Sequence, residues 1–209
     1  PAYVTGVMEQ PAAIAGFTLT TMSIGWPIAS VFSGRLLIKI GYFRTSLLGG
    51  VFLLLGTALF VFMQPGFGPL WAGMSSFFVG VGMGLTSTAF IVSIQSAVSY
   101  DKRGAATASN MFMRNLGSTI GVALLGSILN SSLLNRLNDA GSRLSLESVN
   151  AILSMDSRAK LPEAEKQVLQ EALAFGLRNV YSIAFLCALI SVLLIFGLRG
   201  LKGVKPDVQ

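Results

Sequence analysis

The sequence predicts an all-α fold, a polytopic membrane helical bundle, and three observations support this class. Of the 209 residues, 53% are hydrophobic and only 11% are charged, and the mean hydropathy is +0.70. A soluble domain carries about 25% charged residues, so a water-soluble protein of this length would lack side chains to cover its surface. Five apolar stretches have about the 20 residues that a membrane span needs, and none contains Asp or Glu. This composition excludes an ordinary cytosolic enzyme and a disordered chain.

Helices are the only elements that fit these stretches. A segment in lipid must satisfy its backbone hydrogen bonds internally, which a helix does. The strands of a membrane barrel are about 9–11 residues long and alternate apolar with polar residues, and these stretches do not alternate. We therefore expect four spans within residues 12–134 and a last span within residues 178–200. The five apolar stretches are 12–32, 45–63, 70–98, 105–134 and 180–198.

The charges between the spans predict how the chain is oriented. Residues 1–11 hold a single charge, that of Glu9, and residues 64–69 hold none. Because Lys and Arg gather in cytoplasmic loops, we expect residues 1–11 to be an external loop and residues 201–209 a cytoplasmic tail. The expected location is the plasma membrane, specifically a bacterial inner membrane. The cations on the expected cytoplasmic side are Arg35, Lys39, Arg44, Lys102, Arg103, Arg199, Lys202 and Lys205.

The long segment 135–177 is expected to form an external loop that contains an amphipathic helix. Pro162 stands at a first-turn position, acidic residues follow it, and Gly176 can end the helix, which predicts a helix over 162–176. Val168, Ala172 and Phe175 form a short apolar stripe on it. We expect this helix to lie on the membrane surface or on the outer rim of the protein. A lid that captures a ligand is the alternative interpretation.

Several residue types are missing from the sequence, and their absence limits the chemistry. There is no His, and the single Cys is Cys187, so the sequence offers no disulfide framework, Cys/His zinc site or His-dependent triad. Ser118 and Thr119 have no evident base, so we expect no enzyme activity, no cofactor and no metal. The net charge of +6 reflects the cytoplasmic loops, and we expect no nucleic acid partner. Because we expect an external start at Pro1, we also expect at least one span before this chain.

Arg114 is the first candidate for function. It lies about ten residues beyond Gly104, which is about 15 Å along a helix and near the middle of the membrane. Asn110, Arg114, Gly117 and Gly121 follow helical spacing on one side of the fourth span. A guanidinium at this depth normally faces a bundle interior or a cavity, which predicts contact with substrate or with a carboxylate. The alternative is an interfacial Arg whose side chain reaches the head groups.

Small residues predict close helix packing. Gly80 and Gly84 in the third span, and Gly117 and Gly121 in the fourth, are spaced so that neighbouring helices can approach closely. The string 79–84 resembles a nucleotide-binding pattern but lacks its spacing and lies within an apolar span. The first, third and fourth spans also hold most of the hydroxyl and amide side chains. We therefore expect these three spans to line a cavity and the second and fifth to face lipid.

Trp26 and Pro27 form the third feature. A Pro within a span kinks the helix, which provides either a bending point or a static kink. Met22 and Trp26 are four residues apart and can offer an apolar wall to a lipophilic ligand, or can simply pack. The residues that we expect to line the substrate cavity are Arg114, Asn110, Met22, Trp26, Ser87 and Gln95.

The segment GRLLIKIGYFR, residues 34–44, resembles the signature loop of the major facilitator superfamily, whose form is roughly G-x-L-x-D-R-x-G-R-[KR]-[KR]. Ile38 replaces the acidic residue of that form, and Tyr42 and Phe43 replace basic ones. The positions that match are Gly34, Leu36, Lys39, Gly41 and Arg44. The glycines permit a tight turn between two helices.

The resemblance extends over about residues 5–200, and its most specific part runs from Gln95 to Gly117. Over this length the chain resembles the last five spans of the fourteen-span drug:proton antiporters. The resemblance implies a secondary active transporter that exports small lipophilic or cationic substrates through the lipid bilayer by alternating access. It implies proton coupling through carboxylates in a missing N-terminal half. A passive facilitator and a membrane scaffold without transport activity are the alternatives.

Overall fold

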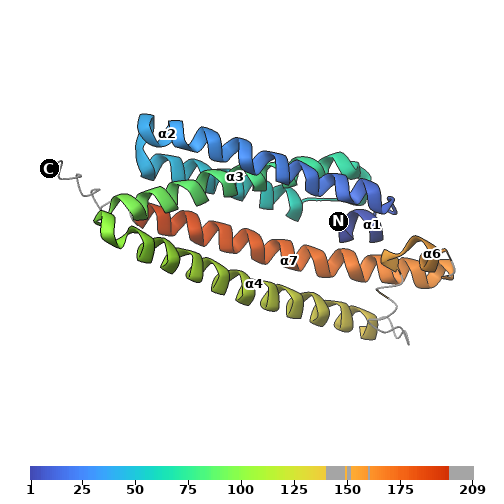
Figure 1. Ribbon diagram of the computed structural model, residues 1–209. Helices are drawn as coiled ribbons and strands as arrows, with labels where there is room; N and C mark the ends of the chain where they lie inside the picture. Colours follow the sequence, from blue (N-terminus) through green and yellow to red (C-terminus); the bar gives the residue numbers. More distant parts are fainter. Residues whose placement is uncertain (140–148, 150–151, 160, 198–209) are drawn as a thin grey trace.

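The computed structural model describes residues 1–139, 149, 152–159 and 161–197, and in this part of the chain all regular elements are helices, so the all-α prediction is confirmed. The expected tail 201–209 lies outside the described residues, as do the expected cytoplasmic cations Arg199, Lys202 and Lys205. In chain order the elements are α1 (Ala2–Gly6), α2 (Ala12–Val61), η1 (Pro65–Phe67), α3 (Gly68–Ser96), η2 (Tyr100–Lys102), α4 (Arg103–Asp139), α6 (Met155–Arg158) and α7 (Glu163–Gly197) (Figure 1).

Helix α2 holds both the first and the second expected span. A straight helix of 50 residues would be about 75 Å long, far more than a membrane needs. At Gly41 the backbone leaves the helical conformation, with φ 80° and ψ 172°, and the chain reverses into two arms that lie side by side (Figure 1). Thr45 Oγ1 donates a hydrogen bond of 2.9 Å to the carbonyl oxygen of Gly41. The expected loop 34–44 is therefore mostly helical, and its turn is confined to the region of Gly41.

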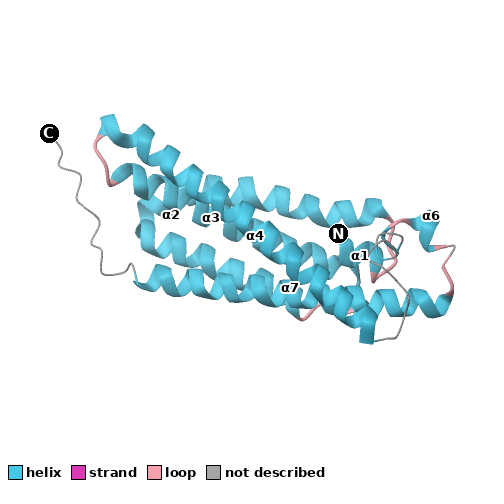
Figure 2. Ribbon diagram, turned by 90° about the horizontal axis from the view of Figure 1, so that it is seen from below, coloured by secondary structure: helices cyan, strands magenta, loops and turns pink. Residues whose placement is uncertain are grey.

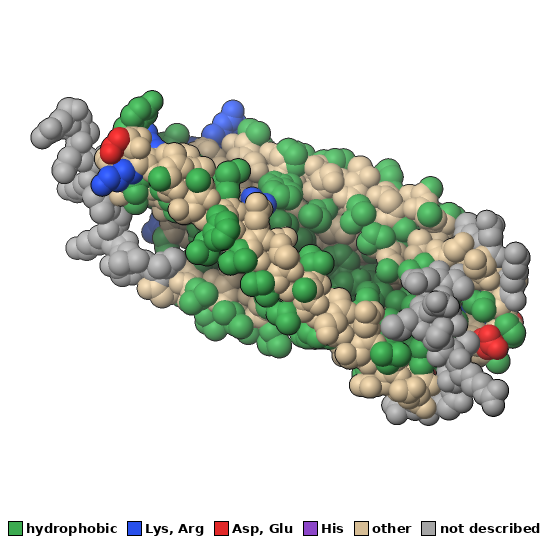
Figure 3. All heavy atoms as spheres, turned by 60° about the horizontal axis from the view of Figure 1, so that its bottom comes forward, with side chains coloured by type: hydrophobic (Ala, Val, Ile, Leu, Met, Phe, Trp, Pro, Cys, Tyr) green, Lys and Arg blue, Asp and Glu red, His purple; other side chains and the backbone are tan. Residues whose placement is uncertain are grey.

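Four helices are long and apolar enough to cross a membrane: α2, Pro65–Ser96, Tyr100–Asn138 and Glu163–Gly197. Since α2 turns back at Gly41, its two arms account for two of the five expected spans. The chain is therefore a multi-pass membrane protein. The turn at Gly41, η2 and the end of α7 lie at one end of the bundle, and α1, η1 and α6 lie at the other (Figure 1). Cationic side chains gather at the first end, and apolar side chains cover much of the surface between the ends (Figure 3).

Helix α3 packs against both arms of α2 through glycines on two of its faces. A Cβ atom on Gly80 would lie 2.5 Å from the carbonyl oxygen of Met22, and one on Gly84 would lie 2.5 Å from that of Trp26. On another face, a Cβ atom on Gly82 would lie 2.7 Å from the carbonyl oxygen of Gly49 in the second arm. No larger residue fits at these positions without moving a backbone, so the glycines set the distance between these helices.

The fourth expected span behaves differently. No described atom lies within 4 Å of a Cβ atom built on Gly117 or Gly121, so the expectation that these two glycines pack closely is not met within the described part of this chain. Helix α4 instead packs against α7 near its C-terminal end, where Leu133 and Leu137 are buried. The physical reason is that a small-residue motif permits a close approach but supplies no partner helix.

Residues 1–11, expected to be a loop, include the short helix α1. It forms because Tyr3 and Val4 bury their side chains in a core that includes Leu169 and Leu173 of α7. The Glu9 carboxylate accepts hydrogen bonds of 2.7 Å from both Lys166 Nζ and Gln170 Nε2. The hydrogen bond from Lys166 is the main reason why the pKa of Glu9 lies below its ordinary value.

Helix α7 corrects the prediction that Gly176 ends a separate surface helix. The helix runs without a break from Glu163 to Gly197, so residues 163–176 belong to the same helix as the last expected span (Figure 2). A Cβ atom on Gly176 would lie 2.9 Å from Leu129 Cδ1, so this glycine serves helix contact with α4. A glycine within a helix costs about 1 kcal/mol relative to Ala, which packing offsets here. The buried face holds Leu169, Ala172, Leu173 and Leu177, whereas Phe175 is exposed.

Candidate functional site

The structure brings Arg114 of α4 against Trp26 of α2. The Arg114 Cζ atom lies 5.2 Å from the centroid of the Trp26 ring. A guanidinium over an indole face is stabilised by about 0.5–1 kcal/mol when exposed and by about 2 kcal/mol or more when water is excluded. The two residues come from helices far apart in the sequence, so the contact is a tertiary one. The Arg114 side chain thus lies against another helix.

The surroundings of Arg114 are open. Most residues from 111 to 120 of α4 have exposed side chains, including Arg114 itself, and Trp26 is half-buried. Among the described residues, no carboxylate lies within ion-pair distance of Arg114. The predicted pairing of Arg114 with a carboxylate therefore has no partner in the described part of this chain. An aromatic face and a cation without a counter-ion are available together at this position.

Asn110 and Gln95 lie in different places. Asn110 is half-buried one helical turn before Arg114 on α4. Gln95 stands next to the last residue of α3, where its Nε2 donates a hydrogen bond of 3.0 Å to Thr107 Oγ1 of α4. This bond ties the ends of α3 and α4 together across η2. The structure therefore places Asn110 beside Arg114, and it gives Gln95 a contact at the helix ends.

Met22 and Ser87 flank the contact between α2 and α3. The backbone of Met22 supports the close approach of Gly80, and its side chain lines a small cavity of about 150 Å³ together with Tyr3, Phe60 and Tyr181. Ser87 is half-buried on α3. Met22 and Trp26 are one turn apart on α2, but the cavity that Met22 lines lies towards α1 and α7. Met22 therefore lines the small cavity while Trp26 contacts Arg114, and the two side chains do not share one wall.

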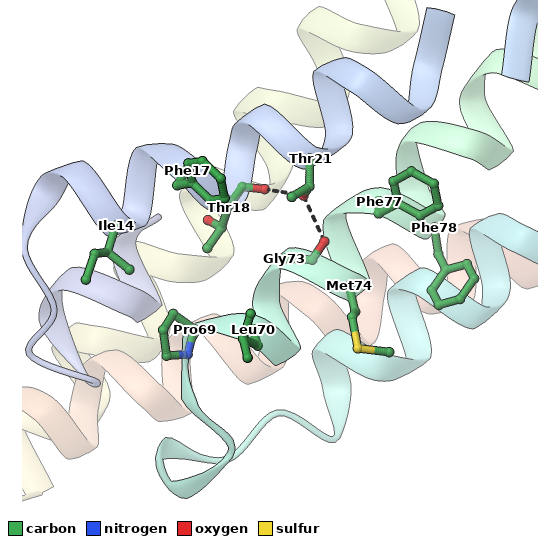
Figure 4. A pocket seen from close by; sticks show the side chains of 10 residues that line it. All are labelled: Ile14, Phe17, Thr18, Thr21, Pro69, Leu70, Gly73, Met74, Phe77 and Phe78. Atoms are coloured by element: carbon green, nitrogen blue, oxygen red, sulfur yellow. Dashed lines mark hydrogen bonds between the residues drawn. The ribbon is translucent and has the colours of Figure 1, made fainter. Parts of the chain in front are cut away.

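A larger cavity lies between the first arm of α2 and the first half of α3, and sequence reasoning did not find it. It has a volume of about 500 Å³, within the range of small-molecule pockets, and its walls are almost entirely apolar (Figure 4). The pattern that could have revealed it is the set of bulky side chains beside Gly73. The residues that line it are Ile14, Phe17, Thr18, Thr21, Pro69, Leu70, Gly73, Met74, Phe77 and Phe78.

The hydroxyl groups near this cavity are engaged by backbone carbonyl groups. Thr21 Oγ1 lies 2.8 Å from the carbonyl oxygen of Thr18 and 2.8 Å from that of Gly73, so it can donate to either (Figure 4). Thr18 donates to Ala15, and Thr86, deeper on α3, donates to Gly82. Hydroxyl groups in these spans therefore satisfy helix carbonyls and connect helices, and the cavity offers a ligand an apolar surface with aromatic rings.

The residues of the expected signature loop surround the reversal of α2. Gly41 is the residue with positive φ, and Gly34 lies within the helix with open space around it. Lys39 and Arg44 are exposed, and Leu36 is half-buried. The structure thus uses one of the two glycines for the turn. These exposed cations lie at the same end of the bundle as Lys102 and Arg103, which stand at the junction between η2 and α4.

Comparison with known proteins adds independent findings. A family model described as the Major Facilitator Superfamily matches residues 1–122. Multidrug resistance protein 3 of Bacillus subtilis (strain 168) is 26% identical over 220 residues, which cover 100% of this chain and 43% of that protein. Multidrug transporter protein MdtP of the same organism is 29% identical over 139 residues, which cover 66% of this chain and 26% of that protein.

A fungal relative is similarly distant. Efflux pump FUS6 of Gibberella moniliformis is 27% identical over 234 residues, which cover 99% of this chain and 40% of that protein. The chain therefore spans less than half the length of these relatives.

Proposed function

The chain belongs to the Major Facilitator Superfamily, and from this premise we propose that it is the C-terminal part of a multidrug efflux transporter. Three of its relatives carry the words multidrug resistance, multidrug transporter or efflux pump in their names. The described helices supply apolar spans, an apolar cavity and an exposed cation near an aromatic ring. These are the parts that a transporter of lipophilic small molecules needs, and none of them depends on catalysis.

The contact between Arg114 and Trp26 is the observation that carries this proposal. An Arg in the middle of an apolar helix is costly unless it faces a polar or aromatic partner. Here it faces Trp26 across the space between α4 and the first arm of α2. A lipophilic substrate that enters this space would meet an indole face, a guanidinium and the Asn110 amide. We assign these three side chains to the substrate cavity.

A second part of the proposal concerns the energy source, for which the family resemblance implies proton coupling. Proton coupling requires a group that gains and loses a proton within the membrane, and the apolar spans contain neither Asp nor Glu. We propose that the coupling carboxylates lie in the part of the protein that precedes this chain, and that Arg114 favours their ionised form. Alternating access would then expose the cavity first to the cytoplasm and then to the outside, with the cation-rich end of the bundle in the cytoplasm of a bacterial cell.

Replacement of Arg114 in the full-length protein tests the proposal. Cells that express the Arg114→Ala variant should lose efflux of the fluorescent lipophilic cation ethidium, while the Arg35→Ala variant, which changes an exposed cation at one end of the bundle, should retain it. Equal amounts of each variant in the membrane must be verified by immunoblot. If the Arg114→Ala variant exports ethidium at the wild-type rate, Arg114 has no role in the mechanism.

The mode of transport needs a separate measurement. A protonophore collapses the proton gradient, so it should stop efflux by a proton-coupled antiporter and leave downhill movement through a facilitator unchanged. Protonophore-resistant transport would overturn antiport and favour the passive alternative. A lack of transport by the wild-type protein for lipophilic cations and neutral compounds alike would overturn the exporter proposal itself.

A further inference from the structure

A polar cavity, separate from the two described above, lies at the end of the bundle that carries α1 and η1. It has a volume of about 340 Å³ and is bounded by the end of the second arm of α2, the last turns of α4 and the first half of α7. Three charged side chains line it: Arg136 of α4, and Glu171 and Arg178 of α7. It is separate from the Arg114 region, and Arg114 and Trp26 do not line it.

The two guanidinium groups in this cavity have no acidic partner in the part of the chain that the structure describes. Among the described residues, neither Arg136 nor Arg178 has a carboxylate within 4 Å, although Glu171 lines the same cavity. The only described side chain that ion-pairs with Glu9 and Glu163 is Lys166. Arg136 is held in place by the Phe175 ring, whose centroid lies 4.8 Å from the Arg136 Cζ atom. The cavity therefore presents two cations and one anion, and a stacked guanidinium keeps its hydrogen-bond donors free for a ligand.

The cavity lies where apolar spans give way to polar surface. Helix α2 ends at Val61. Phe60 and Val61 line the cavity from the last turn of this helix, and Gln64 and Pro65 line it from the segment that follows. On α7 the expected span begins at residue 180, just beyond Arg178. A cavity with apolar walls on one side and guanidinium groups on the other suits the boundary between acyl chains and phospholipid head groups. Both helices also expose apolar side chains along their spans, such as Leu55 and Leu186, which acyl chains can cover.

We propose that this cavity binds the head group of a membrane phospholipid, with the phosphodiester on Arg136 and Arg178. Guanidinium groups bind phosphate oxygens through paired, charge-assisted hydrogen bonds, which are stronger than neutral ones. The Glu171 carboxylate in the same cavity matches the ammonium group of phosphatidylethanolamine, so two arginines and one acid complement a zwitterionic head group. A cavity of this size is within the range that holds small molecules. The site is independent of the transport proposal, because it requires only that the helices span a membrane.

Lipid retention by the purified full-length protein tests this site. Native mass spectrometry in detergent, titrated with phosphatidylethanolamine, should show one tightly bound lipid for the wild-type protein. The double variant Arg136→Gln/Arg178→Gln should bind that lipid about tenfold more weakly, because the charge-assisted hydrogen bonds are lost. The matched control is Arg103→Gln, in which an arginine over the Tyr100 ring at the opposite end of α4 is changed in the same way, and it should retain the lipid. Equal binding by the double variant and the wild type would overturn the proposal.

Two further measurements identify the ligand. Glu171→Gln, an exposed position whose change should not disturb folding, should reduce the preference for phosphatidylethanolamine over phosphatidylglycerol, and an unchanged preference would overturn the role of Glu171. Inorganic phosphate and soluble glycerophosphoethanolamine, each at millimolar concentration, should fail to displace the lipid. Displacement by either would show that the cavity takes a free phosphate compound and would overturn a lipid site.

Discussion

Helices α3 and α4 carry the same kind of small-residue motif, yet one is packed and the other is open. On α3, Gly80 and Gly84 lie directly against the backbone of the first arm of α2. On α4, Gly117 and Gly121 have no described neighbour at Cβ, and Arg114 reaches Trp26 with its side chain alone. The comparison teaches that α2 and α3 form the closely packed part of the described chain, and that α4 leaves the face with Gly117 and Gly121 uncovered by other described residues. We infer that this face lines the transport cavity.

The largest expected effect comes from filling the contact between α2 and α3. Gly84→Ala would place a Cβ atom 2.5 Å from the carbonyl oxygen of Trp26 and 2.8 Å from the Ala29 Cβ, so one helix must move. Overpacking of this kind should destabilise the protein by about 3 kcal/mol. The measurement is the thermal unfolding midpoint of the purified full-length protein. Gly117→Ala is the control, since it removes a helix-interior glycine in open space; an equal loss there would show that another helix covers α4.

The next effect concerns the reversal of α2. Gly41→Ala puts a side chain on a residue with φ 80° and ψ 172°, a conformation that only glycine adopts readily, and should destabilise the protein by about 2 kcal/mol. Gly34→Ala, seven residues earlier within the helix, should be neutral or slightly stabilising. The same thermal measurement compares the two. Equal stability of both variants would show that the turn at Gly41 is not a constraint on the fold.

A smaller effect is expected where α4 meets α2. Trp26→Leu keeps an apolar side chain but removes the face that Arg114 contacts, which is worth about 1 kcal/mol, whereas Trp26→Phe keeps an aromatic face. We expect a several-fold loss of transport of a cationic substrate for Trp26→Leu and a milder loss for Trp26→Phe. Dose–response curves for efflux in cells measure this order. Equal transport by Trp26→Leu and Trp26→Phe would show that the indole serves packing alone.

The smallest effect concerns the ion pair that joins the segment after α1 to α7. The pKa of Glu9 is lowered mainly by its hydrogen bond with Lys166, so the folded protein holds this proton less tightly than the unfolded chain. The contribution of Glu9 is therefore complete above its ordinary pKa of 4.5 and is lost as pH falls through the lower folded value. The unfolding midpoint of wild type minus that of Glu9→Gln should be positive at pH 7 and shrink at pH 3. A difference that does not change with pH would contradict this account.

The separation between local and tertiary information is clearest in α7. Its apolar stretch from residue 180 is a property of composition, and the sequence predicts it directly. Its continuation back through Gly176 places this glycine against Leu129 of α4, which lies 47 residues earlier and occupies the space that a side chain at position 176 would need. From the local sequence alone, a glycine near an expected helix end predicts that the helix ends there. Whether it instead permits contact with a neighbouring helix depends on residues that are distant in the sequence.

The candidate site shows the same division. The sequence singles out Arg114 because a guanidinium within an apolar span is costly, and Trp26 because it precedes Pro27 and lies four residues from Met22. Their contact, the hydrogen bond from Gln95 to Thr107 and the cavity beside Gly73 each join different helices, so no periodicity reports them. The residues are visible in the sequence, but their partners are not.

The sequence by itself determined that this protein is a set of helices in a membrane and where most of those helices run, because hydropathy and backbone hydrogen bonding act within each segment. It also supplied the glycine at which α2 reverses. Only the tertiary structure decided which small residues form contacts, that the helix expected over 162–176 continues into the last span, and which side chains share a cavity. These outcomes depend on the distance between helices, and that distance is set by packing between residues that are remote in the chain.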